Sequence, residues 1–198
     1  SCFLDIDDPI QLFHEWMEEA KKTEPNDPNA VSLATSNQNN MPSVRMVLLK
    51  DFSKDGFVFY TNLNSQKGNE LKENPKASMC FHWKSLLRQI RIKGIVTQVK
   101  DKVADEYYNS RSYESRIGAW ASKQSEKLSS RDELLNSIEE YKKKYNDNNK
   151  VPRPEYWSGW NLSPLSIEFW LDRDSRIHER LIYNKGTNGK WIKSLLSP

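Results

Sequence analysis

The sequence of 198 residues lacks the features that define several classes of protein. It has two cysteines, Cys2 and Cys80, which are too few and too far apart for a disulfide framework or a zinc site. No apolar run reaches membrane-spanning length, and no signal-peptide pattern opens the chain. We therefore expect a protein of a reducing compartment, with a cytoplasmic location and no membrane partner.

Concentrated positive charge is also missing. The net charge is +3, with 30 basic and 27 acidic residues well mixed, so we expect no nucleic-acid partner. The chain has no glycine-rich phosphate loop, no close Cys/His constellation and no nucleophile elbow. We accordingly expect no metal site. If the protein is an enzyme, an organic cofactor is expected to carry out the difficult electronic step.

The elements that are present predict an antiparallel sheet with flanking helices. Asp8-Pro9, followed by apolar residues at helical spacing, predicts a packing helix. Strands are predicted at 30–35, 43–50, 57–61, 77–83, 87–99, 165–171 and 180–183, and helices at 65–73 and within 101–145. Sequential strands joined by short turns favour a mainly β, α+β fold, built as a closed or partly closed barrel with helices outside. One domain is expected to cover 1–198.

Near the C-terminal end, two arginines and the histidine between them occupy every second position. If the segment is extended, Arg176, His178 and Arg180 project from one face. Three neighbouring cationic or titratable groups repel each other, which indicates an anionic or electron-rich partner. The alternative is a solvated strand edge whose charges oppose aggregation.

Further polar groups occur on the predicted strands. Arg45 and Lys50 lie near the ends of a largely apolar strand, where each could meet a phosphate or simply reach water. Gln89 lies between two arginines, where an amide could read a heterocycle or satisfy backbone groups.

Two predicted helices also offer anion-binding groups. A helix expected to begin at Ser65 would present free amides and the positive end of its dipole, although serine is also a routine N-cap. Tyr107 and Arg111 are four residues apart and share a helix face, which Ser115 could extend. A phosphate would suit this set, and ordinary surface polarity is the alternative.

Taken together, these stretches resemble the pyridoxamine 5′-phosphate oxidase family. The resemblance runs from about Asp8 to the C-terminus. It rests on the order and spacing of Arg45-Met46-Val47-Leu48-Leu49-Lys50, Phe59-Tyr60-Thr61-Asn62, Arg88-Gln89, the stretch 115–125, Glu168-Phe169-Trp170 and Arg176-Ile177-His178-Glu179-Arg180.

The resemblance implies a homodimeric, FMN-binding split β-barrel with FMN in clefts between the subunits. It also implies the reaction, in which pyridoxamine 5′-phosphate and pyridoxine 5′-phosphate are oxidised by dioxygen to pyridoxal 5′-phosphate and hydrogen peroxide. FMN is the expected cofactor.

The resemblance further assigns roles to residues. One subunit would line the FMN site with Arg45, Met46, Lys50, Tyr60, Thr61, Lys67 and Gln89, and the other with Gln124, Ser125, Trp170 and Arg180. Val47, Leu48 and Gln66 are also assigned to the cofactor. The substrate phosphate would be held by Lys50, Tyr107, Arg111 and Ser115. Arg176 and His178 would lie over the substrate ring at the reacting carbon and act as the catalytic residues.

The sequence departs from the usual pattern of the family at several positions. Gln66 stands where a second arginine commonly helps to hold the FMN phosphate, Leu171 replaces a glutamine, and Glu179 replaces an aspartate. The terminal residues 195–198 lack the arginine of the family.

Two other functions compete with the oxidase. A split-barrel flavin reductase or oxidase acting on another substrate would keep the FMN contacts without needing the four phosphate residues. A non-catalytic protein that binds FMN or pyridoxal phosphate would have no evident need for Arg176 and His178.

Overall fold

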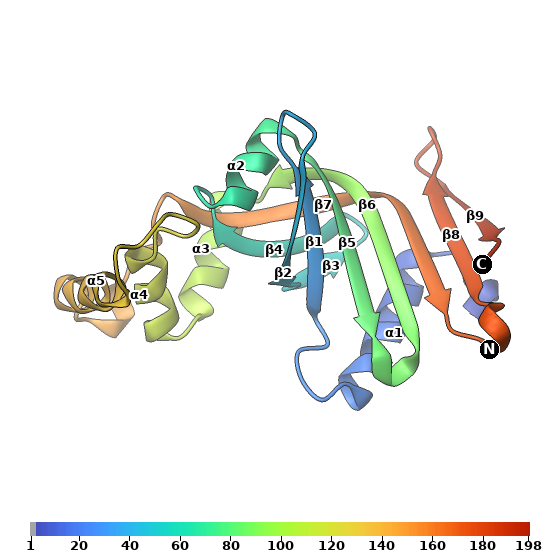
Figure 1. Ribbon diagram of the computed structural model, residues 1–198, viewed down its shortest axis with the longest axis horizontal. Coiled ribbons are helices and arrows are strands. Elements are labelled where there is room, and N and C mark those ends of the chain that lie inside the picture. Colours follow the sequence, from blue (N-terminus) through green and yellow to red (C-terminus); the bar gives the residue numbers. More distant parts are fainter. Residues whose placement is uncertain (1–2) are drawn as a thin grey trace.

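The computed structural model describes residues 3–198, so Cys2 lies outside the described part. Strands in this part form one sheet in the order β2-β1-β5-β6-β7-β4-β3, with β8 paired to β7 and β9 paired to β8. Every pairing is antiparallel. Figure 1 shows α3, α4 and α5 at one end of the molecule and β8 and β9 at the other. The predicted antiparallel sheet with flanking helices is confirmed.

The strands are β1 (Ala30–Ser36), β2 (Pro42–Leu48), β3 (Asp51–Ser53), β4 (Gly56–Asn62), β5 (Lys76–Trp83), β6 (Arg88–Gln98), β7 (Trp157–Leu171), β8 (Glu179–Lys185) and β9 (Trp191–Leu196). The α-helices are α1 (Pro9–Thr23), α2 (Gln66–Glu73), α3 (Asp101–Ser110), α4 (Tyr113–Ala121) and α5 (Arg131–Lys144). Short 3₁₀ turns are η1 (Phe3–Asp5), η2 (Lys84–Leu86), η3 (Asn148–Lys150) and η4 (Asp174–Arg176). None of the helices within 3–198 is long and apolar enough to cross a membrane.

Helix α1 closes one side of the main hydrophobic core. It begins where the Asp8 side chain accepts a hydrogen bond from a backbone amide of the first turn, with Pro9 as the first helical residue, as the sequence predicted. Phe13 is fully buried, and its ring meets those of Phe57 and Phe81 edge-on, at centroid distances of 5.0 and 5.3 Å. Aromatic burial of this kind fixes the helix against the sheet.

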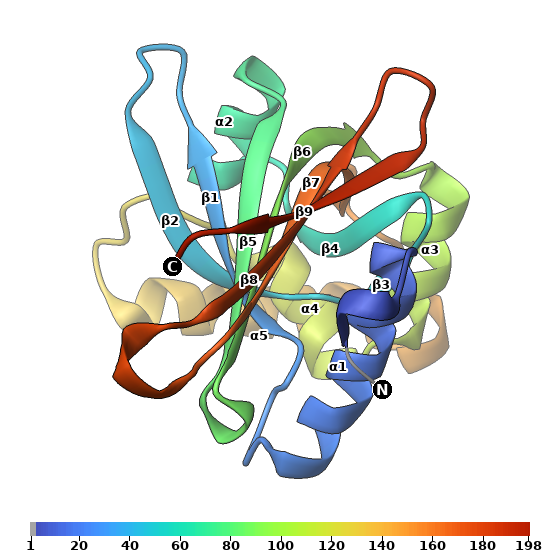
Figure 2. The same ribbon diagram turned by 90° about the vertical axis from the view of Figure 1, so that its right-hand side faces the viewer.

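Strand β7 is the longest strand and joins the two ends of the molecule. It pairs with β6 over most of its length, with β4 through its first residues and with β8 through its last. The register with β6 shifts at Gly94, where a Cβ would lie 2.0 Å from the Ser163 carbonyl oxygen. Figure 2, seen from the right of Figure 1, places β8 and β9 in front of the remaining sheet.

The sequence prediction recovered only the second half of β7, and it missed β3 and β9. The first half of β7 contains Ser158, Gly159 and Asn161, which are typical of turns. Pairing with both β4 and β6 holds this segment extended and overrides the local preference.

A second hydrophobic cluster lies under α3, α4 and α5. Its buried members are Tyr108, Ile117, Val151 and Trp157. The Tyr108 hydroxyl donates to the Arg116 carbonyl oxygen at 3.0 Å and so ties α3 to α4. The cluster therefore fixes both helices against the beginning of β7.

Candidate active site

A cavity of about 650 Å³ opens between the sheet and the helices α3 and α4. Its volume is in the range of sites that hold a small ligand or cofactor. It collects all four residues predicted to hold the substrate phosphate and many of those predicted for the cofactor. The predicted residues in its lining are Met46, Val47, Leu48, Lys50, Tyr60, Thr61, Lys67, Tyr107, Arg111, Ser115 and Gln124.

Lys67 forms a cationic end of the cavity in the first turn of α2. The helix begins there because the Ser65 side chain accepts a hydrogen bond from a backbone amide of that turn. Lys67 Nζ and the Thr61 hydroxyl both donate to Gln124 Oε1, at 3.2 and 3.1 Å. Burial, and then the charge of Arg45, lowers the pKa of Lys67 to about 8. An anion beside Lys67 would favour the protonated amine.

Three aromatic rings form a stack along one wall. Tyr60 lies on Tyr107 with ring centroids 4.0 Å apart, and Trp157 is nearly parallel to both. The guanidinium carbon of Arg111 lies 4.5 Å from the Trp157 centroid, and Lys50 Nζ lies 5.8 Å from the Tyr107 centroid. Cations over aromatic faces are stabilised by the ring quadrupole. The stack therefore holds two cations beside the cavity.

Arg111 brings an unsatisfied donor to this wall. Its Nη1 is buried and has no hydrogen-bond partner within residues 3–198. Burial lowers the pKa of the guanidinium from its usual value. Because a buried charged donor without a partner is costly, an anion in the cavity would stabilise Arg111.

Arg45 and Gln66 were predicted to contact the cofactor, but neither is among the described residues that line the cavity. Arg45 Nη2 lies 3.6 Å from Glu70 Oε2. The Gln66 side chain donates through Nε2 to Glu70 Oε1 at 3.1 Å. The Gln66 backbone amide donates to Ser125 Oγ, also at 3.1 Å. Both predicted residues therefore lie beside Glu70.

A second group of predicted residues lies elsewhere, on β6, β7 and β8. Gln89 pairs with Trp170, and Trp170 pairs with Arg180. Arg180 Nη2 donates to Glu168 Oε1 at 2.8 Å, and this hydrogen bond raises the pKa of Arg180. Glu168, from the Glu-Phe-Trp motif, therefore fixes the Arg180 guanidinium.

The segment from Arg176 to Arg180 is not extended throughout, so the condition for placing its three side chains on one face is not met. Residues 174–176 form the turn η4, in which Ser175 and Arg176 have φ angles of 56° and 63°, and β8 begins at Glu179. A continuous strand is needed to place alternate side chains on one face. Only Arg180 of the three lies on a strand, so their one-face arrangement is not formed.

His178 nevertheless joins the second group. Its ring centroid lies 4.9 Å from that of Trp170. Its Nδ1 lies 2.8 Å from Asp172 Oδ1 and 3.1 Å from the Arg173 backbone nitrogen. These contacts fix the ring from its Nδ1 side.

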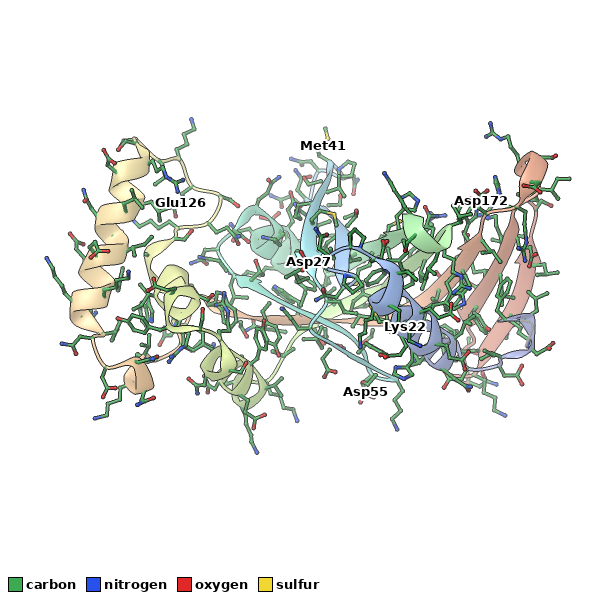
Figure 3. The ribbon with its side chains drawn as sticks, turned by 90° about the horizontal axis from the view of Figure 1, so that it is seen from below. Lys22, Asp27, Met41, Asp55, Glu126 and Asp172 are labelled. Atoms are coloured by element: carbon green, nitrogen blue, oxygen red, sulfur yellow. The ribbon has the colours of Figure 1, made fainter. Side chains whose placement is uncertain are left out.

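The two groups lie at opposite ends of β7. Trp157 is the first residue of the strand and Trp170 the last but one, and a straight strand of this length spans about 45 Å. Figure 3 shows the separation through Glu126, next to Ser125 in sequence, and Asp172, two residues after Trp170.

The implied division of residues between subunits stays a prediction, and the contacts within one chain bear on three of its members. Gln89 was grouped with Lys67, but its strand register places it beside Trp170. Gln124 and Ser125 were assigned to the other subunit, but in one chain they contact Lys67 and Gln66.

Sequence reasoning missed several residues of this arrangement. Trp157 stands in no motif of the sequence, and the structure shows it 6% exposed in the second hydrophobic cluster. Asp172 and Glu70 are single acidic residues in charged segments, with no signal of their own. Residues 3–198 contain no group of three or more His, Cys, Asp or Glu side chains placed to hold a metal ion.

Comparison with known proteins identifies similar chains over the whole length. A family model described as Pyridoxamine 5′-phosphate oxidase matches residues 17–145, and one described as Pyridoxine 5′-phosphate oxidase C-terminal dimerisation region matches residues 157–198. The chain is 78% identical to the pyridoxine/pyridoxamine 5′-phosphate oxidase of Pelagibacter ubique, covering 100% of this chain and 95% of that one. The corresponding enzyme of Chelativorans sp. is 52% identical, with coverage of 99% and 93%.

Two solved structures are similar as well. PhzG from Burkholderia lata, in complex with tetrahydrophenazine-1-carboxylic acid, superposes with a TM-score of 0.92 at 29% identity, covering 99% of this chain and 96% of that one. A pyridoxamine 5′-phosphate oxidase-related, FMN-binding protein of Nostoc punctiforme gives a TM-score of 0.77 at 16% identity, with coverage of 96% and 98%, and supports the fold alone.

The aromatic stack depends on a residue without a side chain. A Cβ at Gly159 would lie 2.8 Å from two ring carbons of Tyr60, whereas a Cβ at Gly118, in the same cavity, would meet nothing within 4 Å. We expect Gly159→Ala to lower the free energy of unfolding by about 1–3 kcal/mol through overpacking. Gly118→Ala should leave it unchanged or raise it by up to about 1 kcal/mol, because alanine favours helix. Urea unfolding at equal protein concentration measures both, and equal losses would contradict this role of Gly159.

The lowered pKa of Lys67 predicts a pH dependence for the binding of a phosphorylated ligand, here FMN. Phosphate favours the protonated amine, which the free protein loses above about pH 8. The Kd for FMN should therefore be constant near pH 7 and rise above pH 8, by at most about tenfold per pH unit. Lys67→Arg keeps its charge and should remove this rise. Fluorescence titration measures the Kd, and an equal rise in both proteins would exclude Lys67 as its source.

Proposed function

The chain belongs to the pyridoxamine 5′-phosphate oxidase family, and we propose that it oxidises pyridoxamine 5′-phosphate and pyridoxine 5′-phosphate to pyridoxal 5′-phosphate. Its fold is the split β-barrel of this family, and FMN is the cofactor of the family. Dioxygen is the proposed final electron acceptor, and hydrogen peroxide the second product. The low cysteine content supports a cytoplasmic location.

The cavity residues fit an FMN molecule and a phosphorylated substrate. Lys67, Thr61 and Gln124 offer polar contacts suited to the cofactor phosphate. Met46 and Leu48, alternate residues of β2, are exposed and supply apolar surface that a flavin ring needs. When bound, FMN accepts a hydride equivalent from the substrate carbon.

The substrate phosphate has its own set of residues, and Arg111 carries the proposal. Lys50, Tyr107 and Ser115 line the same cavity as Arg111, whose buried Nη1 has no partner in the described chain. A phosphate between these side chains would give Arg111 the acceptor it lacks. Fixing the phosphate would hold the reacting carbon in position, and such orientation can supply a large part of the rate acceleration.

We propose that the complete site needs two copies of the chain. Gln89, Trp170, Arg176, His178 and Arg180 lie at the far end of β7, so a second copy would have to bring them to the cavity. The segment 157–198 matches a dimerisation region and contains four of these five residues. The proposed assembly is a homodimer with the FMN sites between its subunits.

Arg176 and His178 would act at the substrate ring. Arg176 would stabilise developing negative charge or orient the ring, and His178 would hold or move a proton near the reacting carbon. Asp172 lies 2.8 Å from His178 Nδ1, so Nε2 is the nitrogen left free for this role.

The oxidase is favoured over a split-barrel enzyme with another type of substrate. PhzG was solved with a carboxylic acid that carries no phosphate. Lys50, Tyr107, Arg111 and Ser115 meet in one cavity here, and a substrate without a phosphate would not need all four.

Flavin spectroscopy tests the proposed reaction. Pyridoxamine 5′-phosphate, added without oxygen, should bleach the absorbance of the FMN-loaded protein, and air should restore it. Pyridoxamine, which lacks the phosphate, should bleach it far more slowly. A flavin that stays oxidised with the phosphorylated substrate would refute the oxidase, and equal rates with both amines would refute the phosphate site.

A variant of Arg111 can test whether the substrate phosphate and the FMN phosphate are held by separate sets of residues. Arg111→Ala should raise the substrate KM by about 10- to 100-fold, because a charge-assisted contact contributes about 1.5–3 kcal/mol. The Kd for FMN should change less than threefold. Steady-state kinetics and flavin fluorescence measure the two quantities. Parallel losses of substrate and FMN binding would show that Arg111 serves the cofactor as well.

A further inference from the structure

A buried arginine, Arg116, lies beneath the corner between α3 and α4 and has no part in the reaction described above. It is 8% exposed and is not among the described residues that line the cavity. The residues of this corner that do line it are Arg111, just after α3, and Ser112 and Ser115, at the start of α4. Arg116 therefore supports the corner from outside the cavity.

Two hydrogen bonds of the Arg116 guanidinium tie the corner to the rest of the chain. Nε donates to the Arg111 carbonyl oxygen at 3.1 Å, and Nη2 donates to Asn148 Oδ1 at 2.6 Å. Within residues 3–198, no other group donates to the Arg111 carbonyl oxygen. Because Asn148 belongs to η3, one planar side chain joins the end of α3 to the turn beyond α5.

The backbone of Arg116 is itself held in place. Its carbonyl oxygen accepts a hydrogen bond from the fully buried Tyr108 hydroxyl at 3.0 Å, and its amide donates to the Ser112 carbonyl oxygen at 3.0 Å. The base of the Arg116 side chain is thus fixed to both helices. Its guanidinium can therefore transmit that position to Arg111.

The charge of Arg116 has no carboxylate partner within residues 3–198. The acidic residue nearest to it in sequence, Glu114, pairs with Lys142 at 3.2 Å instead. Burying a cation among neutral oxygens is costly, and an apolar side chain could fill the same space without that cost. Packing alone therefore does not explain an arginine at this position.

We propose that Arg116 is a positioning residue for the substrate phosphate and acts through Arg111. The inference rests on the proposed function in one respect, that Arg111 binds this phosphate. Arg111 has φ and ψ angles of −77° and 155°, so its carbonyl group lies outside the hydrogen-bond ladder of α3. Arg116 fixes this carbonyl group instead, and with it the base of the side chain whose guanidinium rests on Trp157.

A double-mutant cycle tests whether Arg116 acts through Arg111. Arg116→Met removes both hydrogen bonds and keeps a long, unbranched side chain. It should raise the KM for pyridoxamine 5′-phosphate by about five- to tenfold, because Arg111 loses its support. The kcat should change by less than about twofold, because the phosphate is held equally in the ground state and the transition state.

The same substitution should have little effect once Arg111 is gone. In the Arg111→Ala protein, adding Arg116→Met should change the KM by less than about twofold, because two residues that act as a unit are not additive. Steady-state kinetics of the four FMN-loaded proteins measures this cycle. Pyridoxamine is the reference substrate, and its kcat/KM should change by less than about twofold in Arg116→Met, since it has no phosphate to position.

Three further variants separate positioning from charge and from lost stability. Arg116→Lys keeps the charge but cannot bridge two acceptors, so its KM should stay at least about threefold above that of the wild type. Asn148→Ala removes one acceptor at an exposed position and should raise the KM by about two- to threefold. It replaces Arg116→Met in the cycle if that protein does not fold. Tyr183→Phe removes a hydrogen bond to the Ile6 carbonyl oxygen far from the cavity and should leave the KM unchanged.

The possible outcomes differ in what they overturn. Equal losses with pyridoxamine 5′-phosphate and pyridoxamine, or a wild-type KM in Arg116→Lys, would refute the positioning role. A wild-type protein that does not oxidise pyridoxamine 5′-phosphate would contradict the proposed function, and the role of Arg116 with it. Wild-type oxidation with additive effects of the two substitutions would leave that function standing and remove only the Arg116 proposal.

Discussion

The pairing of β7 is the constraint on which the rest of the structure depends. One strand is held by β6 along one edge and by β4 and then β8 along the other. This arrangement fixes Trp157 under the helices and Trp170 beside His178, at opposite ends. The proposal that the site needs a second chain follows from that separation.

Electrostatics at the cavity follow from the same architecture. The fold gathers cations into a partly buried space, and it holds each one differently. Lys67 is bound to an amide oxygen, Arg111 rests on an indole, and Arg45 is paired with a carboxylate. These three arrangements leave different amounts of free hydrogen-bonding capacity, and Arg111 is left with the most evident need for an anion.

Much of the fold could be predicted from the sequence because its signals are local. Asp8-Pro9 marks the start of α1, and alternating or apolar runs mark most strands. The first half of β7 could not be predicted, because its turn-forming residues are extended only by pairing on both edges. The turn η4 was missed for a related reason, since positive φ angles at Ser175 and Arg176 leave no trace in residue type.

The members of the site could be predicted better than their grouping. Motifs identified the residues around Lys67 and around Trp170, but which of them share one end of a strand is a property of the register. Contacts such as that of Thr35 with Glu70 join positions far apart in sequence, so no motif contains both.

The separation of the two groups along β7 also has a genetic consequence. In the proposed dimer, each site takes its cavity from one chain and its His178 group from the other. A chain with a damaged cavity and a chain with a damaged His178 group would then form a mixed dimer in which one site has two damaged halves and the other has two sound ones. Two inactive alleles of this gene could restore partial activity to each other when both are expressed in one cell.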